Sequence, residues 1–247
     1  MKVQELILRR GHDERRAVFC AVNDSALQPF AAAPETLLSS AEMARLDAMQ
    51  FAQKRCGFLL GRLAAKIALG AMLAETDWRS IDIRPGAFGQ PLVGHPRALG
   101  VDVTVSHSHG TAVALAYPAD WPLGIDLETV ADDAAAVVLA ELDPSPDETA
   151  WLASGALGTS AACGVLWAAR EALGKAMKTG VNCPLGILSL CAIKAADPPS
   201  GAPTGTVAWC GAYTNFPQSR WHAQVCGGRV LLLAVPGEIE IALWPHL

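Results

Sequence analysis

The chain has 247 residues, of which 51% are hydrophobic and 17% charged, and its formal net charge is -5. This composition excludes intrinsic disorder, which requires low hydrophobicity and high charge. A chain of this length can bury a sizeable core. The acidic balance excludes a global basic field of the kind that holds nucleic acid or an anionic membrane, so any anion-binding surface must be local.

The sequence carries no clear signal for export or for membrane insertion. No apolar run reaches the roughly 20 residues of a membrane span, because Arg62 and Lys66 interrupt the most apolar stretch, residues 58–74. The N-terminal segment lacks the longer apolar centre of a signal peptide. The seven cysteines are scattered without a C-x-x-C pair, which is typical of reduced thiols. We therefore expect a cytoplasmic protein without nucleic-acid or membrane partners.

The first half of the chain predicts two helices. Ser39 and Glu42 have the spacing of a capping box just before an apolar periodic stretch, so a helix should start there. Residues 56–75 predict a longer helix, on which residues four and seven apart align. Three positive residues, Arg55, Arg62 and Lys66, align in this way and form a short basic stripe. A basic stripe of this kind is most often a solvated helix face.

Strand patterns dominate the rest of the chain. The alternation in residues 101–105 predicts a strand, followed by a turn at 106–110 and a returning strand at 111–117. A late helix is expected over residues 160–178. This irregular mixture predicts an α+β fold rather than a regular βαβ array. The other expected strands are 6–8, 17–22, 123–128, 207–212, 221–225 and 230–235, with loops at 85–100 and 195–205.

Asp126 and Glu128 are separated by one residue in a predicted strand, so both side chains project from the same face. Two like charges this close favour a bound cation, and a hard divalent ion such as Mg²⁺ takes oxygen ligands of this kind. The alternative is a solvent-facing side of the strand, because an isolated D-x-E pattern is common on protein surfaces.

Trp167, Glu171 and Lys175 are spaced by four residues on the predicted late helix and so lie along one line of its surface. One interpretation is a core tryptophan beside an ordinary Glu–Lys helix pair. The other makes Glu171 a metal ligand or general base and Lys175 a point charge for phosphate.

His107 lies in a predicted turn beside Ser106 and Ser108, where backbone N–H groups and hydroxyls can face an anion. An exposed histidine without a function is the commoner case. Ser108 and Gly110 match the end of a G-x-S-x-G nucleophile elbow, but Ser106 occupies the place of the first glycine, which argues against a serine hydrolase. The sequence contains no P-loop or Rossmann glycine motif.

Four motifs, taken in chain order, resemble those of the 4'-phosphopantetheinyl transferases of the Sfp type. The last two are fairly specific, and residues 58–62 also look like that family's first helical region. The resemblance covers roughly residues 36–190. The four motifs are Gly89-Gln90-Pro91, Val105-Ser106-His107-Ser108, Gly124-Ile125-Asp126-Leu127-Glu128 and the W-A-A-R-E-A-L-G-K segment from Trp167 to Lys175.

The resemblance implies a fold and an activity. It implies two similar α+β subdomains, residues 1–120 and 121–247, that form a pseudo-dimer within one monomeric chain, although no sequence repeat between the halves is visible. It implies Mg²⁺-dependent transfer of the phosphopantetheine arm of coenzyme A to a serine of an acyl, peptidyl or aryl carrier protein.

The resemblance also implies roles for individual residues. Asp126, Glu128 and Glu171 would hold the metal, and Glu171 would also help to deprotonate the serine. Lys175 would neutralise phosphate charge, so that Asp126, Glu171 and Lys175 form the catalytic group. The residues expected to contact coenzyme A are Arg62, Gln90, Ser106, His107 and Lys175.

The sequence departs from the family pattern at several positions. Gln90 replaces the lysine of a G-K-P motif, which removes a positive charge near the nucleotide. Arg170 replaces a frequent lysine and keeps its charge. Glu42 and Gln53 stand where many relatives are more basic. These departures motivate the alternative of a non-catalytic homologue that binds coenzyme A or a carrier protein without transfer.

Overall fold

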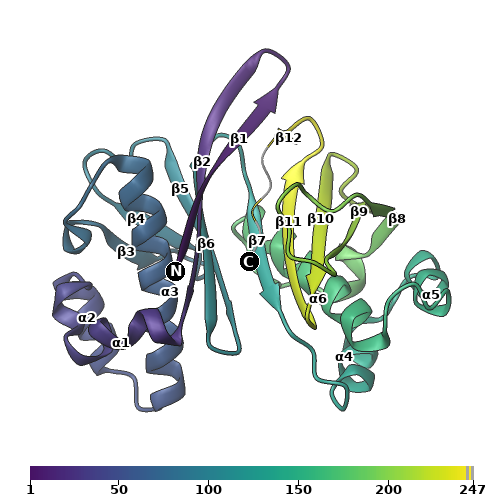
Figure 1. Cartoon of the computed structure of the whole chain (residues 1–247), viewed down its shortest axis with the longest axis horizontal. Helices are drawn as coiled ribbons and strands as arrows, with labels where there is room; N and C mark the ends of the chain where they lie inside the picture. Colours follow the sequence, from purple (N-terminus) through teal and green to yellow (C-terminus); the bar gives the residue numbers. More distant parts are fainter. Residues whose placement is uncertain (243–244, 246–247) are drawn as a thin grey trace. The chain divides into compact units, whose positions relative to one another are not determined.

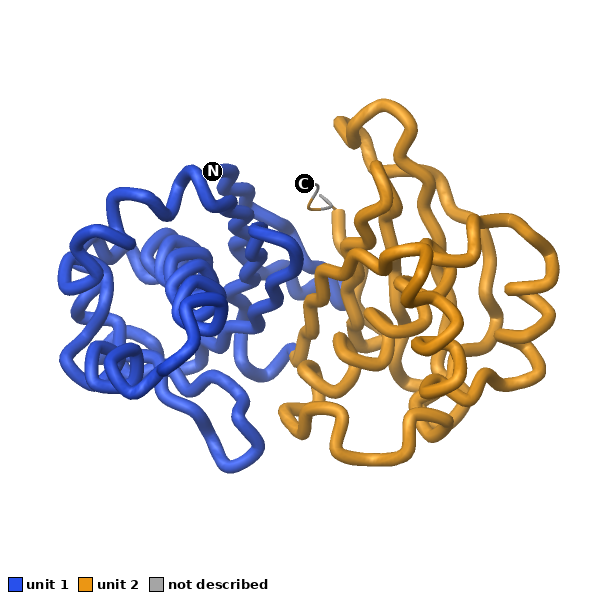
Figure 2. The backbone as a smooth tube through the Cα atoms, turned by 90° about the horizontal axis from the view of Figure 1, so that it is seen from below, with its two compact units in different colours: residues 1–121 blue, residues 122–247 orange. Residues whose placement is uncertain are grey.

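The computed structural model, which describes residues 1–242 and 245, divides into two compact units, Met1–Trp121 and Pro122–Leu247 (Figure 2). Each unit is α+β and packs a long helix against one face of an antiparallel sheet (Figure 1). All seven cysteines are free thiols.

The first unit has a sheet in which neighbouring strands follow the order β1-β2-β6-β5, together with a separate hairpin of β3 and β4. Its strands are β1 (Lys2–Arg10), β2 (Asp13–Asn23), β3 (Asp82–Pro85), β4 (Pro91–Gly94), β5 (Val101–Ser108) and β6 (Thr111–Pro118). Its helices are α1 (Asp24–Ala32), α2 (Ser40–Asp47) and α3 (Ala52–Leu73), with 3-10 turns η1 (Pro34–Thr36) and η2 (Trp78–Ser80).

The helix α3 is the core helix of the first unit. It begins before the expected residue 56 and, among the helices in the described part of the chain, is the one with the length and apolar composition that could cross a membrane. However, 67% of its most apolar window is buried inside the protein. Leu63 and Leu69 are among the side chains that it packs into the core. This burial is what a core helix requires.

The second unit has the sheet order β7-β11-β10-β9-β8, with all neighbours antiparallel, and α6 lies on this sheet. Its strands are β7 (Gly124–Glu128), β8 (Leu190–Ala196), β9 (Val207–Tyr213), β10 (Ser219–Cys226), β11 (Arg229–Pro236) and β12 (Glu240–Ile241). Its helices are α4 (Ala135–Leu142), α5 (Pro146–Ala153) and α6 (Thr159–Ala176), with the 3-10 turn η3 (Leu185–Leu188).

The predicted helices and strands are confirmed within a few residues, and the mixed α+β class is confirmed, but some segments differ. The strand β5 continues through Ser106 and His107 to Ser108, so the predicted turn at 106–110 contains only two residues. The predicted loop at 85–100 contains β4, and β8 extends into the predicted loop at 195–205. The sequence patterns predict no helix at α1, α4 or α5, which have 8 or 9 residues and show no clear period. For the equally short α2, the capping box at its start supplies the prediction.

The two units repeat one order of elements. The series β2, α2, α3, β3, β4, β5, β6 in the first unit corresponds to β7, α5, α6, β8, β9, β10, β11 in the second. In both units the first strand of the series pairs with the last, and the last two strands form a hairpin. The sequence hides this repeat, because the order of elements is shared while residue identities are not. The two units differ in one respect, since β3 and β4 form a separate sheet whereas β8 and β9 belong to the main sheet of the second unit.

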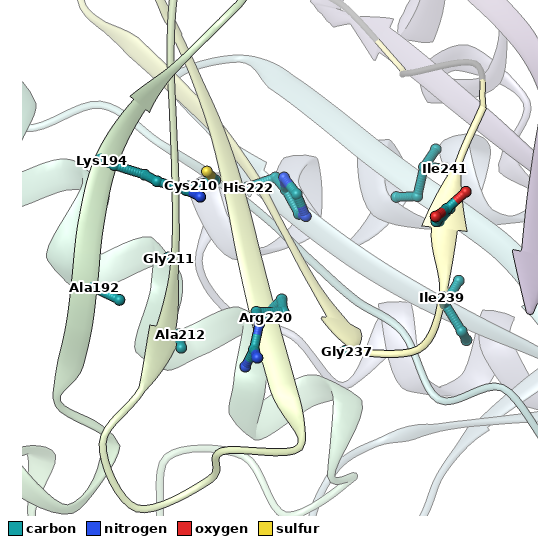
Figure 3. A pocket seen from close by; sticks show the side chains of 11 residues that line it. Ala192, Lys194, Cys210, Gly211, Ala212, Arg220, His222, Gly237, Ile239 and Ile241 are labelled. Carbon is teal, nitrogen blue, oxygen red and sulfur yellow. The ribbon is translucent and has the colours of Figure 1, made fainter.

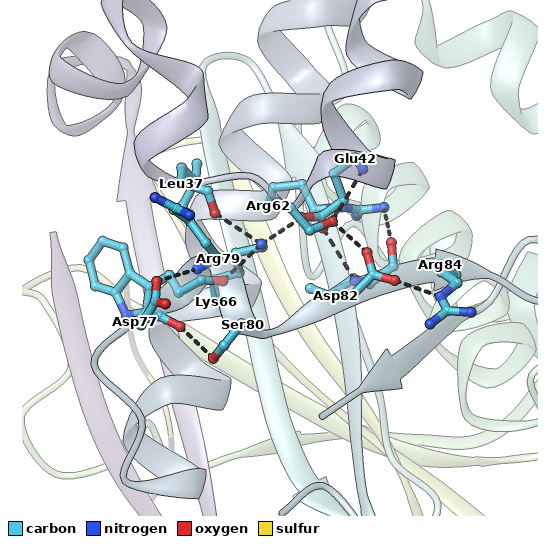
Figure 4. Close-up of polar contacts among 12 residues, drawn as sticks. Leu37, Glu42, Arg62, Lys66, Asp77, Arg79, Ser80, Asp82 and Arg84 are labelled. Carbon is cyan, nitrogen blue, oxygen red and sulfur yellow. Dashed lines mark hydrogen bonds and ion pairs between the residues drawn. The ribbon is translucent and has the colours of Figure 1, made fainter. Parts of the chain in front are cut away.

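A buried ion cluster joins α2 to α3 in the first unit (Figure 4). Ser39 and Glu42 form the predicted capping box of α2. The carboxylate of Glu42 also binds Arg62 (Oε1 to Nε, 2.9 Å) and Lys66 (Oε2 to Nζ, 2.5 Å). The solvated-stripe interpretation is therefore wrong for Lys66, which is fully buried. Lys66 Nζ further donates to the carbonyl oxygens of Leu37 and Trp78, each at 2.9 Å.

The same cluster recurs in the second unit, with arginine in place of lysine. Ser145 and Glu148 form the capping box of α5. Glu148 Oε1 lies 2.9 Å from Nη1 of Arg170, which is fully buried on α6. Arg170 also donates to the carbonyl oxygens of Leu142 and Leu185. The cluster anchors α6, and with it the residues that follow on the helix.

Candidate active site

The strand β7 lies directly against α6 at Gly124. A Cβ atom at this position would lie 1.8 Å from the carbonyl oxygen of Ala172, so only glycine permits the approach. Residues two apart on a strand face the same side. Asp126 and Glu128 therefore project from the same face as Gly124, toward α6.

Lys175 on α6 binds Asp126 on β7. Its Nζ donates to Oδ1 at 2.5 Å, although the two residues are 49 positions apart. The side chain of Asp126 is 4% exposed and that of Lys175 is 23% exposed. Solvent therefore screens this ion pair less than it would a surface pair.

Glu171 lies one helical turn before Lys175. Burial raises the pKa of Glu171 above its ordinary value, Lys175 opposes this change, and the negative charges of Asp126 and Glu128 raise the pKa further. Charges act in this way only when they lie near one another. The junction of β7 and α6 therefore gathers three carboxylates and one ammonium group.

The three carboxylates at this junction have the oxygen chemistry that a hard divalent cation prefers. Mg²⁺ binds carboxylate oxygens and keeps waters in its remaining positions, and three carboxylates carry more negative charge than Lys175 neutralises. Nevertheless, within residues 1–242 and 245, no three His, Cys, Asp or Glu side chains are gathered closely enough to hold a metal ion. The metal role of Asp126, Glu128 and Glu171 stays a prediction.

Two other residues of the late helix have structural roles. Trp167 is partly buried and packs against the core of the second unit, as the structural interpretation expected. Glu148 neutralises the charge of Arg170 in an ion pair, so Arg170 is not available to a ligand. The S-x-x-E spacing of Ser145 and Glu148 is a sequence signal for the capping box that holds Glu148 beside Arg170, as the same spacing is for Ser39 and Glu42.

Ser106 and His107 lie at the end of β5, in the first unit. Ser106 is buried, whereas His107 is exposed. The imidazole of His107 lies over α3 at Gly57, where a Cβ atom would be 3.2 Å from Cε1. The absence of a side chain at Gly57 thus makes room for the ring. The coenzyme A contacts of Ser106 and His107 stay predictions.

The side chains of Arg62 and Gln90 face partners within the first unit. Arg62, with 13% of its side chain exposed, pairs with Glu42, and its guanidinium group lies 4.6 Å from the ring centroid of Phe58. Gln90 Oε1 accepts a hydrogen bond of 2.9 Å from the backbone N–H of Phe88 and closes the loop between β3 and β4. These contacts give both residues structural roles, and their ligand roles stay predictions.

The carboxylates of the candidate site occur in only one of the two units with the repeated order of elements, among the residues that the structure describes. The strand β2 corresponds to β7 through the pairing of each with its hairpin, β5–β6 or β10–β11, and α3 corresponds to α6 through their buried cations. The first unit has apolar or weakly polar residues at the aligned positions. The aligned pairs are Cys20 and Asp126, Val22 and Glu128, and Ile67 and Glu171. Of the two units, only the second therefore carries the carboxylates at these positions.

Residues 122–235 match the family model of the 4'-phosphopantetheinyl transferase superfamily. The match contains β7, α6 and the four residues at their junction, and it covers less than half of the chain. No curated protein matches the sequence.

Solved structures that match part of the chain include several synthases. One is a holo-(acyl-carrier-protein) synthase from Bacillus anthracis in complex with CoA (3',5'-ADP), which is 18% identical over 45% of this chain and 96% of that chain, at a TM-score of 0.37. A holo-ACP-synthase from Plasmodium yoelii is 14% identical over 48% of this chain and 97% of that chain, at 0.36. A Helicobacter pylori holo-[acyl-carrier-protein] synthase in complex with coenzyme A is 18% identical over 40% and 96%, at 0.33.

Proposed function

We propose that this protein is an Mg²⁺-dependent 4'-phosphopantetheinyl transferase of the Sfp type. It would move the phosphopantetheine arm of coenzyme A to a serine hydroxyl of an apo carrier protein. The observation that carries the proposal is the ion pair of Lys175 with Asp126 where β7 meets α6, with Glu128 and Glu171 on the same two elements, within the segment that matches the superfamily model.

The reaction requires positioning and charge stabilisation more than covalent chemistry by the protein. The serine oxygen forms a bond to the phosphorus that carries the pantetheine arm, and the bond from this phosphorus to the bridging oxygen breaks. Adenosine 3',5'-bisphosphate leaves with that oxygen. Glu171, whose pKa is raised by burial, is suited to accept the serine proton. A divalent ion held by Asp126, Glu128 and Glu171 would supply Lewis-acid stabilisation of the phosphate charge.

Lys175 supplies the positive charge of the chain itself at this site. Its ammonium group is partly exposed while it binds Asp126, so a phosphate oxygen can approach it. A lysine is a compact point charge that suits phosphate. We assign Lys175 to the negative charge that develops on the diphosphate.

The proposal assigns the coenzyme A contacts of the first unit to four residues. Of these, His107 is exposed and Ser106 is its buried neighbour, whereas Glu42 already neutralises the charge of Arg62, and Gln90 is neutral. We further propose that residues 1–120 and 121–247 act as the two subdomains of a pseudo-dimer in a monomeric, cytoplasmic chain.

Mass spectrometry of a carrier protein tests this function. Incubation of the protein with coenzyme A, Mg²⁺ and an apo acyl, peptidyl or aryl carrier should increase the carrier mass by one phosphopantetheine arm. Glu171→Gln should reduce the rate by on the order of 10²-fold or more. Asp147→Asn removes an exposed carboxylate from α5 and should leave the rate unchanged. The proposal would be contradicted if the acyl, peptidyl and aryl carriers all remained unmodified.

A second candidate function is that of a homologue that binds coenzyme A or a carrier without transfer. It is favoured because the side chains of Arg62 and Gln90 already have partners within the protein. The same assay separates the two candidates when it is combined with calorimetry. Binding of coenzyme A with no change in carrier mass would establish the second candidate and reject the first.

A further inference from the structure

A cavity of about 700 Å³ opens on the sheet of the second unit, which is a typical size for a small-molecule site. Its walls come from β8, β9, β10 and residues 237–241 (Figure 3). Nothing in the transferase proposal uses this cavity.

The cavity lies on the face of the sheet that is opposite α6. On β10, Trp221 and Ala223 are buried in the core that contains α6. Arg220 and His222 alternate with them and therefore face the other way. The carboxylates of β7 project toward α6. The cavity and the candidate active site are thus separated by the thickness of the sheet.

The pairing of the strands brings three polar side chains side by side in the cavity. Lys194 on β8 is paired with Cys210 on β9, which is paired with His222 on β10. Paired positions place side chains about 5 Å apart. The strand β8 has a register shift between Cys191 and Lys194, with Ala192 at a φ of 51°. Bulges of this kind often re-aim side chains beside binding sites.

Two positive charges in the cavity have no negative partner in the part of the chain that the structure describes. Among the residues that the structure describes, neither Lys194 nor Arg220 lies within ion-pair distance of a carboxylate, Glu240 of the cavity wall included. The Nη1 atom of Arg220 donates to the carbonyl oxygens of Pro217 and Ser219, at 2.8 and 3.2 Å. Those bonds fix the guanidinium group without neutralising its charge.

His222 adds a neutral polar group on the same face of the sheet. Burial and the positive charge of Lys194 lower the pKa of His222 to about 4, so the ring is uncharged at pH 7. Apart from the carboxylate of Glu240, the rest of the wall is small or apolar, with Gly211 and Ala212 on β9 and the buried side chain of Ile239. The cavity therefore offers charge on one part of its wall and an apolar surface on another.

We infer that this cavity binds a small organic phosphate. A phosphate dianion matches the two unneutralised cations, since arginine and lysine both form charge-assisted bonds to phosphate oxygens. The small side chains leave room for the organic part, which contacts Ala212 and Ile239. The inference does not depend on the transferase activity.

Phenyl phosphate is the probe for this site, with inorganic phosphate and benzoate as comparisons. In a titration of the full chain followed by amide NMR, phenyl phosphate should shift the signals of β8, β9 and β10. It should bind more tightly than inorganic phosphate, which lacks the apolar part, and than benzoate, which carries one negative charge. Tighter binding of benzoate would overturn the assignment to phosphate.

Two variants and a matched control test which residues bind phenyl phosphate. Lys194→Gln and Arg220→Gln change exposed residues and should each weaken phenyl phosphate binding by on the order of tenfold or more. Arg229→Gln removes one positive charge outside the cavity and should leave the affinity unchanged. Thermal melts show whether each variant is folded. Equal weakening by Arg229→Gln, shifts confined to β7 and α6, or no binding at millimolar phenyl phosphate would each overturn the inference.

Discussion

Lys175 Nζ donates to Asp126 Oδ1 at 2.5 Å and so joins α6 to β7. The oxygen that receives this bond belongs to a predicted metal ligand. A divalent cation bound at this site would therefore compete with the ammonium group of Lys175 for the same negative charge. The affinity for such a cation would then depend on a residue that carries no metal-binding atom.

We predict that Lys175→Met increases the affinity for Mn²⁺ in the absence of coenzyme A, by several-fold to tenfold. The reason is that a positive charge beside three carboxylates is removed. Calorimetry with Mn²⁺ measures the change, and Arg229→Gln serves as a control for net charge. The same Lys175→Met protein should lose on the order of 10²-fold in transfer rate. Unchanged Mn²⁺ affinity in the Lys175 variant would contradict the proximity of metal and lysine.

The raised pKa of Glu171 predicts a pH-dependent effect on stability. The folded protein retains the proton of Glu171 to higher pH than the unfolded chain, whose ordinary value is 4.5. Stability therefore falls as the pH rises from that value through the folded pKa. Glu171→Gln removes this loss, so the variant should be more stable than the parent at pH 7.5 and equal to it near pH 4.

Urea denaturation at the two pH values measures this difference. In thermal melts at pH 7.5, the melting midpoint of Glu171→Gln would rise above that of the parent by roughly 2 to 4 °C for each kcal/mol recovered. Glu141→Gln changes an exposed residue of α4 and should show no comparable effect. A Glu171→Gln protein that is less stable than the parent at pH 7.5 would show that favourable contacts of the carboxylate outweigh its burial.

Arg170 provides a test of the buried cluster in the second unit. Arg170→Met leaves Glu148 buried without its cation and should lower the free energy of unfolding by about 3–5 kcal/mol. Arg170→Lys should cost clearly less, because Lys66 performs the same task in the first unit. Denaturant titration of both variants gives the comparison. Equal losses in the two variants would contradict the equivalence of the two clusters.

Gly124 provides a test of the contact between β7 and α6. Gly124→Ala forces a methyl group onto the backbone of Ala172 and should cost about 3 kcal/mol or more, with loss of transfer activity. Gly61→Ala is the control, because its added methyl group would meet Val105 at an ordinary 3.5 Å. That control lies within α3, so it should be neutral or stabilise by up to about 1 kcal/mol. Similar stabilities for the two variants would contradict the close approach.

Parts of the site could be predicted because they depend on local periodicity. The two-residue period of a strand places Asp126 and Glu128 on one face, and the helical period aligns Glu171 with Lys175. The capping box of Ser39 and Glu42 is likewise a local pattern, and the structure confirms it. In contrast, Lys66 and Arg170 resemble exposed helix residues in the sequence, and only contacts with distant carboxylates and carbonyl groups explain their burial.

The sequence by itself determined the α+β class, most element positions and the local spacing of the candidate catalytic side chains. It did so because hydrophobic period, turn residues and helix caps act between near neighbours in the chain. Only the tertiary structure decided that Lys175 binds Asp126, that Gly124 admits the backbone of α6, and that the two units repeat one order of elements. These features depend on packing between residues far apart in the chain, and many different sequences satisfy the same packing.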